Sequence, residues 1–152
     1  MTNAHARRPF WVYLLVFVCI VLGGGGLYGG YAFVTDPTGA SIGMNVSMLR
    51  GFADTYLPFG VLLLIAFGVV PLILAWALIA RPPWFAGIAR STGHDGAWVL
   101  TLATGVGLLV WMAGQFVIMG YTAPIQAFTS FLGAAITLLS LAPAVRRYYQ
   151  VA

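Results

Sequence analysis

The sequence predicts an all-α fold, a single four-helix transmembrane bundle that occupies residues 1–152. Hydrophobic residues make up 61% of the chain and charged residues only 7%, whereas soluble domains carry about 25% charged residues. Four apolar stretches each have about the length that a helix needs to cross a hydrocarbon core roughly 30 Å thick. The arginines flank these stretches mainly on one side, as expected for a membrane protein of fixed orientation.

The predicted spans are 10–34, 57–80, 97–120 and 123–145, and none contains a charged side chain. Helices are expected rather than strands because the apolar runs are continuous and do not alternate with polar residues. The loop between the first two helices is the longest segment outside the predicted spans. The chain therefore reads as one transmembrane domain with a longer outer loop between helices one and two.

Prolines and caps set several of the expected boundaries. Asp54 or Thr55 can cap the second helix, and the Pro82-Pro83 pair ends it. Pro71 lies inside the second span, where it should kink the helix and free a backbone carbonyl that a neighbour must satisfy. In the fourth span, prolines are expected in the opening turn, at position 124, and near the end, at position 143.

Arginine placement predicts the orientation. Six of the seven basic residues fall on one side of the predicted bundle and Arg50 on the other; the six are Arg7, Arg8, Arg81, Arg90, Arg146 and Arg147. The positive-inside rule makes the side with six cytoplasmic. Both termini are therefore expected in the cytoplasm, with the chain multi-pass in a bacterial cytoplasmic membrane. A signal peptide, including a twin-arginine one, is the competing interpretation of residues 7–31, but the run is long and lacks a small-x-small cleavage site before Tyr31.

The loops carry turn signals. Residues 36–39 read Asp-Pro-Thr-Gly, a sequence typical of a type I turn. Residues 42–52 mix apolar and polar side chains, which fits either a short helix lying flat at the interface or an irregular loop folded over the bundle mouth. The loop at 81–96 is short, and its residues 91–96 look like a solvated turn.

The outer loop and the last three predicted spans resemble a group of small uncharacterised bacterial four-helix membrane proteins. The residues that carry this resemblance are Asp36-Pro37-Thr38-Gly39, Ile42-Gly43-Met44, Phe52-Ala53-Asp54, Pro58, Gly60, Trp111, Gln115 and Gln126. The resemblance implies the topology and singles out these polar positions. The group has no established activity, so the resemblance implies none for this chain.

Polar residues inside lipid usually face the bundle or a cavity, because an unpaired polar group is costly there. Trp111 and Gln115 lie one turn apart on the third predicted helix, with Gln126 at the start of the fourth and Asp54 at the start of the second. The functional interpretation of these residues is a polar pocket at the outer mouth, able to hold a lipid headgroup or polar ligand. The sequence favours the simpler interpretation, an interhelical hydrogen bond from Gln115 that stabilises the bundle.

Small residues predict close helix packing. Gly25 with Gly29, and Gly26 with Gly30, match the small-xxx-small pattern of the first helix. The partner of this face is another helix of the chain, an identical subunit or a larger complex. A second face, on the fourth helix, contains Thr129, Gly133 and Thr137; we expect it to pack against a neighbouring helix, with a polar conduit as the alternative.

The sequence contains few residues that could support catalysis or metal binding. Cys19 is the single cysteine, and the two histidines, His5 and His94, fall outside the predicted spans, so we expect no metal and no cofactor. No phosphate-binding motif or activated nucleophile is evident, and the basic residues form no stripe for nucleic acid. These observations predict a protein that is not an enzyme. The leading function is an accessory or structural subunit that packs in a larger membrane complex or homo-oligomer, surrounded by membrane lipids; the alternative is a small transporter, channel or lipid-binding protein using the outer mouth.

Overall fold

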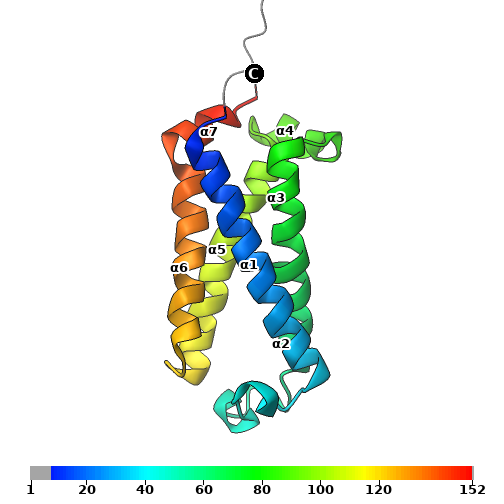
Figure 1. The fold of residues 1–152 in the computed structure, drawn as a ribbon, viewed down its shortest axis with the longest axis vertical. Coiled ribbons are helices and arrows are strands. Elements are labelled where there is room, and N and C mark those ends of the chain that lie inside the picture. Colours follow the sequence, from blue (N-terminus) through cyan, green and yellow to red (C-terminus); the bar gives the residue numbers. More distant parts are fainter. Residues whose placement is uncertain (1–7, 152) are drawn as a thin grey trace, which may run out of the picture.

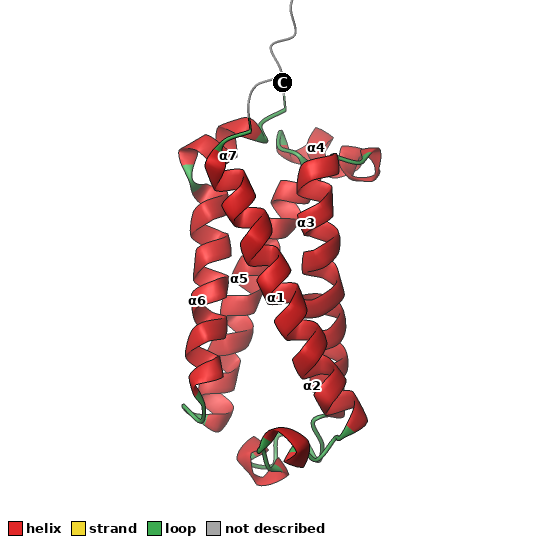
Figure 2. Cartoon of the chain, viewed as in Figure 1, coloured by secondary structure: helices red, strands yellow, loops and turns green. Residues whose placement is uncertain are grey.

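The computed structural model describes residues 8–151, and this part of the chain is helical with no strand (Figure 2). Four helical segments are long and apolar enough to cross a membrane: α1 (Phe10–Thr35), Leu57–Ala80, α5 (Gly96–Met119) and α6 (Pro124–Leu141). The prediction of an all-α chain with four long apolar helices is confirmed. His5 and Arg7, which entered the sequence predictions, lie outside the described residues.

The second segment contains a change of helix type that Pro71 explains. It runs as α2 (Leu57–Leu62), a π-helix η3 (Leu63–Val69) and α3 (Val70–Ala80). Proline has no N–H and cannot donate to the carbonyl of Phe67 four residues earlier. Just before it, the Val70 N–H donates to the Ile65 carbonyl five residues back, so the predicted disturbance takes the form of a π-helical turn. Among the expected caps, Thr55 is the one that acts, with its hydroxyl accepting from the Leu57 N–H at 3.0 Å.

The fourth helix ends earlier than predicted. The expectation of a continuous span to residue 145 is wrong, because α6 stops at Leu141 and a separate helix, α7 (Pro143–Tyr148), follows. Ala142 has an extended backbone, with ψ of 132°, since a residue before proline disfavours the α conformation. The Tyr149 hydroxyl then donates to the Leu78 carbonyl at 2.8 Å, which fastens the end of the chain to α3.

The loop at 81–96 is more ordered than a solvated turn. It contains η4 (Pro83–Phe85) and α4 (Ala86–Thr92), so residues 91 and 92 belong to a helix, contrary to the prediction. Gly93 ends α4 in the left-handed conformation, with φ of 69°, a backbone state that glycine adopts at little cost. His94 stacks on Trp98 with ring centroids 4.6 Å apart and is half-buried rather than exposed.

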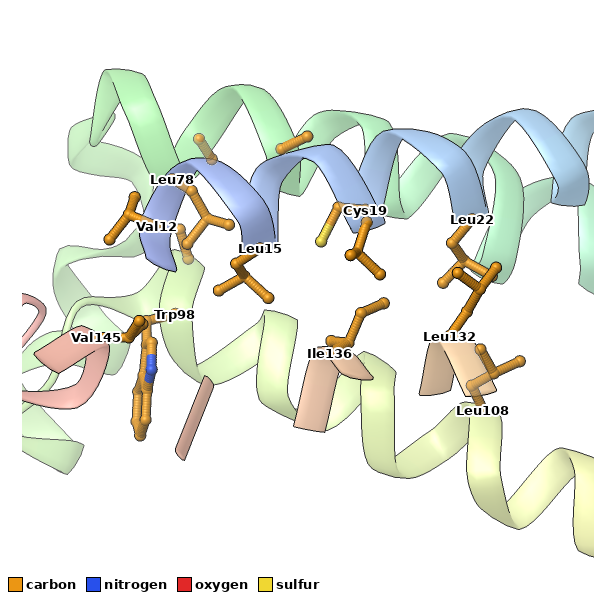
Figure 3. Close-up of a cluster of buried hydrophobic side chains, with 14 of the residues drawn as sticks. Val12, Leu15, Cys19, Leu22, Leu78, Trp98, Leu108, Leu132, Ile136 and Val145 are labelled. Carbon is orange, nitrogen blue, oxygen red and sulfur yellow. The ribbon is translucent and has the colours of Figure 1, made fainter. Parts of the chain in front are cut away.

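α1 begins and α7 ends at one end of the bundle, here called the terminal end; residues 36–56 cover the opposite one, the loop end (Figure 1). At the terminal end, Val12, Leu15 and Cys19 of α1 pack toward α3, α5 and α6 in a buried core (Figure 3). A smaller core at the loop end gathers around Phe33, Leu49 and Tyr56. Between these cores, α1 and α2 diverge from α5 and α6 (Figure 1).

Candidate functional site

Three glycines bring α1 into backbone contact with the second helical segment. A Cβ on Gly26 would lie 2.1 Å from the carbonyl oxygen of Phe67, and one on Gly30 would lie 2.5 Å from the amide nitrogen of Leu64. At Gly23, it would lie 2.5 Å from the Leu72 side chain. No other residue type fits at Gly26 or Gly30 unless backbone moves. Each glycine lowers the stability of an isolated helix, and this contact with the second helical segment stabilises the glycine-rich part of α1.

The remaining glycines of this run face away from that contact. A Cβ built on Gly24, Gly25 or Gly29 meets nothing within 4 Å. The predicted packing face of α1 is therefore divided within this chain: Gly26 and Gly30 pack closely against the second helical segment, whereas Gly25 and Gly29 make no such contact and line a cavity that Gly26 also borders.

α5 and α6 meet through small residues at their own interface. A Cβ on Gly105 would lie 2.7 Å from the Thr137 hydroxyl, and one on Gly133 would lie 3.2 Å from the Leu109 side chain. The Thr137 hydroxyl donates to the Gly133 carbonyl of its own helix at 2.8 Å. These two residues of the predicted α6 face lie in a close helix–helix contact, while the third, Thr129, lies on the cavity wall.

The cavity has a volume of about 810 Å³. It lies between the pair formed by α1 and the second helical segment and the pair formed by α5 and α6. Its walls come from α1, α5, α6 and the second helical segment, and residues of the 36–56 loop close part of it. Volumes of roughly 300–1,000 Å³ are usual for sites that hold small molecules. The lining is aromatic, aliphatic and methionine-rich and includes no charged side chain among residues 8–151, and methionines adapt readily to irregular apolar partners.

Side chains of the predicted turn hold the 36–56 loop at the mouth of this cavity. The Asp36 carboxylate accepts hydrogen bonds from Thr38 and from the Ser41 N–H, the latter at 2.7 Å, and the bond from the Thr38 hydroxyl is the main reason that the Asp36 pKa is lowered. The Gly39 N–H donates to the Asp36 carbonyl at 3.0 Å, as the predicted turn requires.

Tyr56 anchors the other end of the loop. Its ring stacks on Phe33 with centroids 4.7 Å apart, and its hydroxyl donates to the Asn45 carbonyl at 2.9 Å. Burial raises the Tyr56 pKa, because the charged form of the hydroxyl is disfavoured away from water. The loop carries two short 3₁₀ helices, η1 (Ala40–Ile42) and η2 (Val46–Leu49), rather than one helix over residues 42–52, and several of its residues line the cavity.

The predicted pocket residues have different surroundings. Gln126 is committed to the turn between α5 and α6, because its amide oxygen accepts from the N–H groups of Thr122 at 2.7 Å and Ala123 at 3.2 Å and its nitrogen donates to the Gly120 carbonyl at 3.1 Å. Gln126 also touches the cavity, as do Trp111 and Gln115. Asp54 is exposed and does not line the cavity.

Trp111 and Gln115 lie one turn apart on the cavity side of α5. The Trp111 ring lies against Phe59 and Phe67, with centroids 5.8 Å and 6.4 Å away, and its buried indole N–H has no partner among residues 8–151. The Gln115 amide likewise makes no hydrogen bond within the described chain. The interhelical hydrogen bond that the sequence favours for Gln115 is therefore not present among residues 8–151, and that expectation is wrong for this arrangement.

The apolar size of the site was not predicted from the sequence, which directed attention to its polar rim. Four methionines are the one pattern that points to it, since all four line the cavity although two come from the loop, Met44 and Met48, and two from α5, Met112 and Met119. Within residues 8–151, no three histidine, cysteine, aspartate or glutamate side chains gather as a metal site would require. The described walls of the cavity offer an apolar shape and a few neutral hydrogen-bonding groups. Comparisons with protein family models, curated proteins and solved structures find no match to this chain.

Proposed function

We propose that this chain is a non-catalytic multi-pass protein of the bacterial cytoplasmic membrane, with both termini in the cytoplasm, that binds a lipid-like molecule inside its bundle. The observation that carries the proposal is the cavity of about 810 Å³ with no charged side chain on its described walls. Many large apolar side chains also point outward from the helices, such as Val117, Phe17 and Leu138. An outer surface of this kind favours hydrocarbon as the surrounding solvent.

An unfilled apolar space of this size is unfavourable, because the side chains that line it lose dispersion contacts on one face. Water is a poor filler, since a buried water needs two to four polar partners and the free polar groups here are few. An alkyl or isoprenoid chain from the bilayer would restore the contacts at little desolvation cost. The proposal therefore selects lipid binding from the alternatives that the sequence leaves open.

Filling the cavity from its glycine wall tests this function. Gly25→Leu and Gly29→Leu would place side chains into the cavity without meeting any existing atom within 4 Å of the new Cβ. Gly24→Leu is the matched control, because its Cβ is equally free but Gly24 does not line the cavity. We expect lipid co-purified in mild detergent, measured by native mass spectrometry, to fall in the first two variants only. Equal lipid retention in all three variants and the wild type would refute the proposal.

The topology is tested independently. Alkaline phosphatase and green fluorescent protein fused to each terminus report the periplasm and cytoplasm respectively. We expect fluorescence and no phosphatase activity at both ends, because six of the seven arginines flank the spans on that side. Opposite reports from the two termini would rule out an even number of crossings.

A second candidate function is an accessory subunit of a membrane complex or homo-oligomer. The observation that favours it is the open side of α1, where Gly24, Gly25 and Gly29 have nothing within 4 Å of their Cβ positions. Such a strip would let the backbone of a partner helix approach closely. Gentle extraction followed by sizing and mass spectrometry distinguishes the candidates: a stoichiometric partner lost in both Gly24→Leu and Gly25→Leu supports the subunit, whereas a monomer that retains lipid supports the binding protein.

A further inference from the structure

We infer that the cavity selects an uncharged amphiphile, with a hydroxyl or carbonyl oxygen that hydrogen-bonds the amide of Gln115 while its chain lies along the glycine wall of α1. This inference rests on the proposed lipid-binding function and adds the chemical class of the ligand. It follows from the charge of the walls, the free amide and the positions of the polar groups around it.

The walls exclude an ionic group. No arginine, histidine, aspartate or glutamate lines the cavity among residues 8–151. Neither aspartate of the loop lines the cavity: Asp36 is held in its own turn by Thr38 and Ser41, and Asp54 is exposed. Burying a carboxylate, phosphate or ammonium without a partner is far more costly than burying a neutral hydroxyl or ester. Fatty acid carboxylates and phospholipid headgroups are therefore disfavoured inside the cavity.

The amide of Gln115 supplies the complementary polar contact. A glutamine side chain offers two donors and one acceptor oxygen, and the contrast with Gln126 is informative because Gln126 uses both ends within the protein. Gln115 is half-buried on the cavity wall and uses neither end within the described chain. A ligand oxygen at this position recovers a hydrogen bond that the protein alone does not make.

The helix register places a second free polar group nearby. The contacts of Gly105 with Thr137 and of Gly133 with Leu109 set the antiparallel alignment of α5 and α6. Extended toward the loop end at 1.5 Å per residue, this alignment puts Thr129 within about 3 Å of Gln115 in height. The Thr129 hydroxyl also lines the cavity and makes no hydrogen bond within residues 8–151. Together, Gln115 and Thr129 form a narrow neutral polar band.

Apolar walls lie on both sides of this band. Toward the terminal end are Leu22, Leu108 and Leu132, and toward the loop end are Met44 and Met119. A charged headgroup at the band would meet no counter-ion among the described lining residues. A neutral oxygen there allows its hydrocarbon to extend along Gly25 and Gly29 without a steric barrier.

Matched sixteen-carbon probes test this inference. Nanodiscs containing the protein would be loaded with equal mole fractions of hexadecane, 1-hexadecanol, 2-hexadecanone or palmitate at pH 8, and retention measured by native mass spectrometry. We expect the wild type to retain the alcohol and the ketone about fivefold more than hexadecane, the effect of one neutral hydrogen bond, and more than palmitate. In Gln115→Leu this preference falls to near one while hexadecane retention stays unchanged. Thr104→Val is the control, because its hydroxyl bonds to the Leu100 carbonyl and does not line the cavity.

The outcomes separate this inference from the proposed function. Suppose that Gly25→Leu lowers hexadecane retention. If Gln115→Leu then leaves the ratio of alcohol to hexadecane retention unchanged, or if the wild type retains palmitate as well as the alcohol, the inference about the ligand class fails while the proposed lipid binding is supported. If no probe is retained more by the wild type than by Gly25→Leu, the proposed function fails with it. Preferential loss of alcohol and ketone retention in Gln115→Leu supports both.

Discussion

Replacing Gly26 with alanine tests whether the backbone contact of α1 holds the bundle together. The added methyl group would lie 2.1 Å from the Phe67 carbonyl oxygen and 2.3 Å from its carbon. Ordinary van der Waals contact begins near 3.4 Å, so the helices must move apart by more than 1 Å. Overpacking of this kind costs about 1–3 kcal/mol, and the gain in helix propensity over glycine returns at most about 1 kcal/mol.

The matched variant is Gly25→Ala, which has the same propensity gain and meets no atom within 4 Å. We expect the free energy of unfolding of Gly26→Ala to lie about 2 kcal/mol below that of Gly25→Ala. The measurement is reversible unfolding in mixed micelles by titration with sodium dodecyl sulfate, followed by tryptophan fluorescence and helical circular dichroism. Equal stabilities for the two alanine variants would show that α1 and η3 do not approach each other as closely as this reasoning requires.

Three further predictions concern hydrogen bonds. Gln126→Leu should lower the unfolding free energy by about 2–3 kcal/mol, because it leaves the Ala123 and Gly120 backbone groups unpaired; Gln115→Leu, measured by the same titration, should be near neutral. Tyr149→Phe should lower the unfolding free energy by about 1–2 kcal/mol, because it removes the 2.8 Å hydrogen bond to the Leu78 carbonyl. Tyr31→Phe, at an exposed position, should leave the unfolding free energy unchanged. Because the folded state lowers the Asp36 pKa through the Thr38 and Ser41 bonds, the loop turn should be stable above the ordinary carboxyl pKa and loosen as pH falls through the lowered value. Hydrogen exchange at the Ser41 amide measures this, and Asp36→Asn should abolish the dependence whereas Asp54→Asn should not.

The four long helices could be predicted from the sequence because uncharged apolar runs and flanking arginines are local signals. The Asp36 turn could be predicted for the same reason, since aspartate, proline and glycine occupy fixed places within four residues. Pro143 marks the break at Ala142 in the sequence, but the prediction placed this proline inside a continuous helix. A proline near the end of a long apolar run is compatible with the last turn of one helix or with the first turn of another. In the structure a new helix begins there, and the hydrogen bond from Tyr149 to Leu78 attaches it to α3.

The cavity could not be predicted, because it depends on how far two helix pairs diverge rather than on any local pattern. Gly25 and Gly26 are adjacent identical residues that both border the cavity, yet a Cβ on Gly26 would meet the Phe67 carbonyl whereas one on Gly25 would meet no atom within 4 Å. Only the rotation of α1 about its axis distinguishes them. In the same way, Gln115 and Gln126 have equal polarity, but only Gln126 meets a helix terminus with unpaired backbone groups.

The glycine contact and the cavity have a common structural origin. Gly23, Gly26 and Gly30 draw α1 onto the segment that contains η3, and that segment widens just before Pro71 because proline removes an α-helical donor. Close approach on this side moves α1 away from α5 and α6 toward the loop end, where the helix pairs diverge (Figure 1). Any substitution that pushes α1 off η3 should therefore narrow the cavity as well as weaken the bundle. On this reasoning, Gly26→Ala loses bound lipid even in the folded protein, whereas Gly25→Ala retains it.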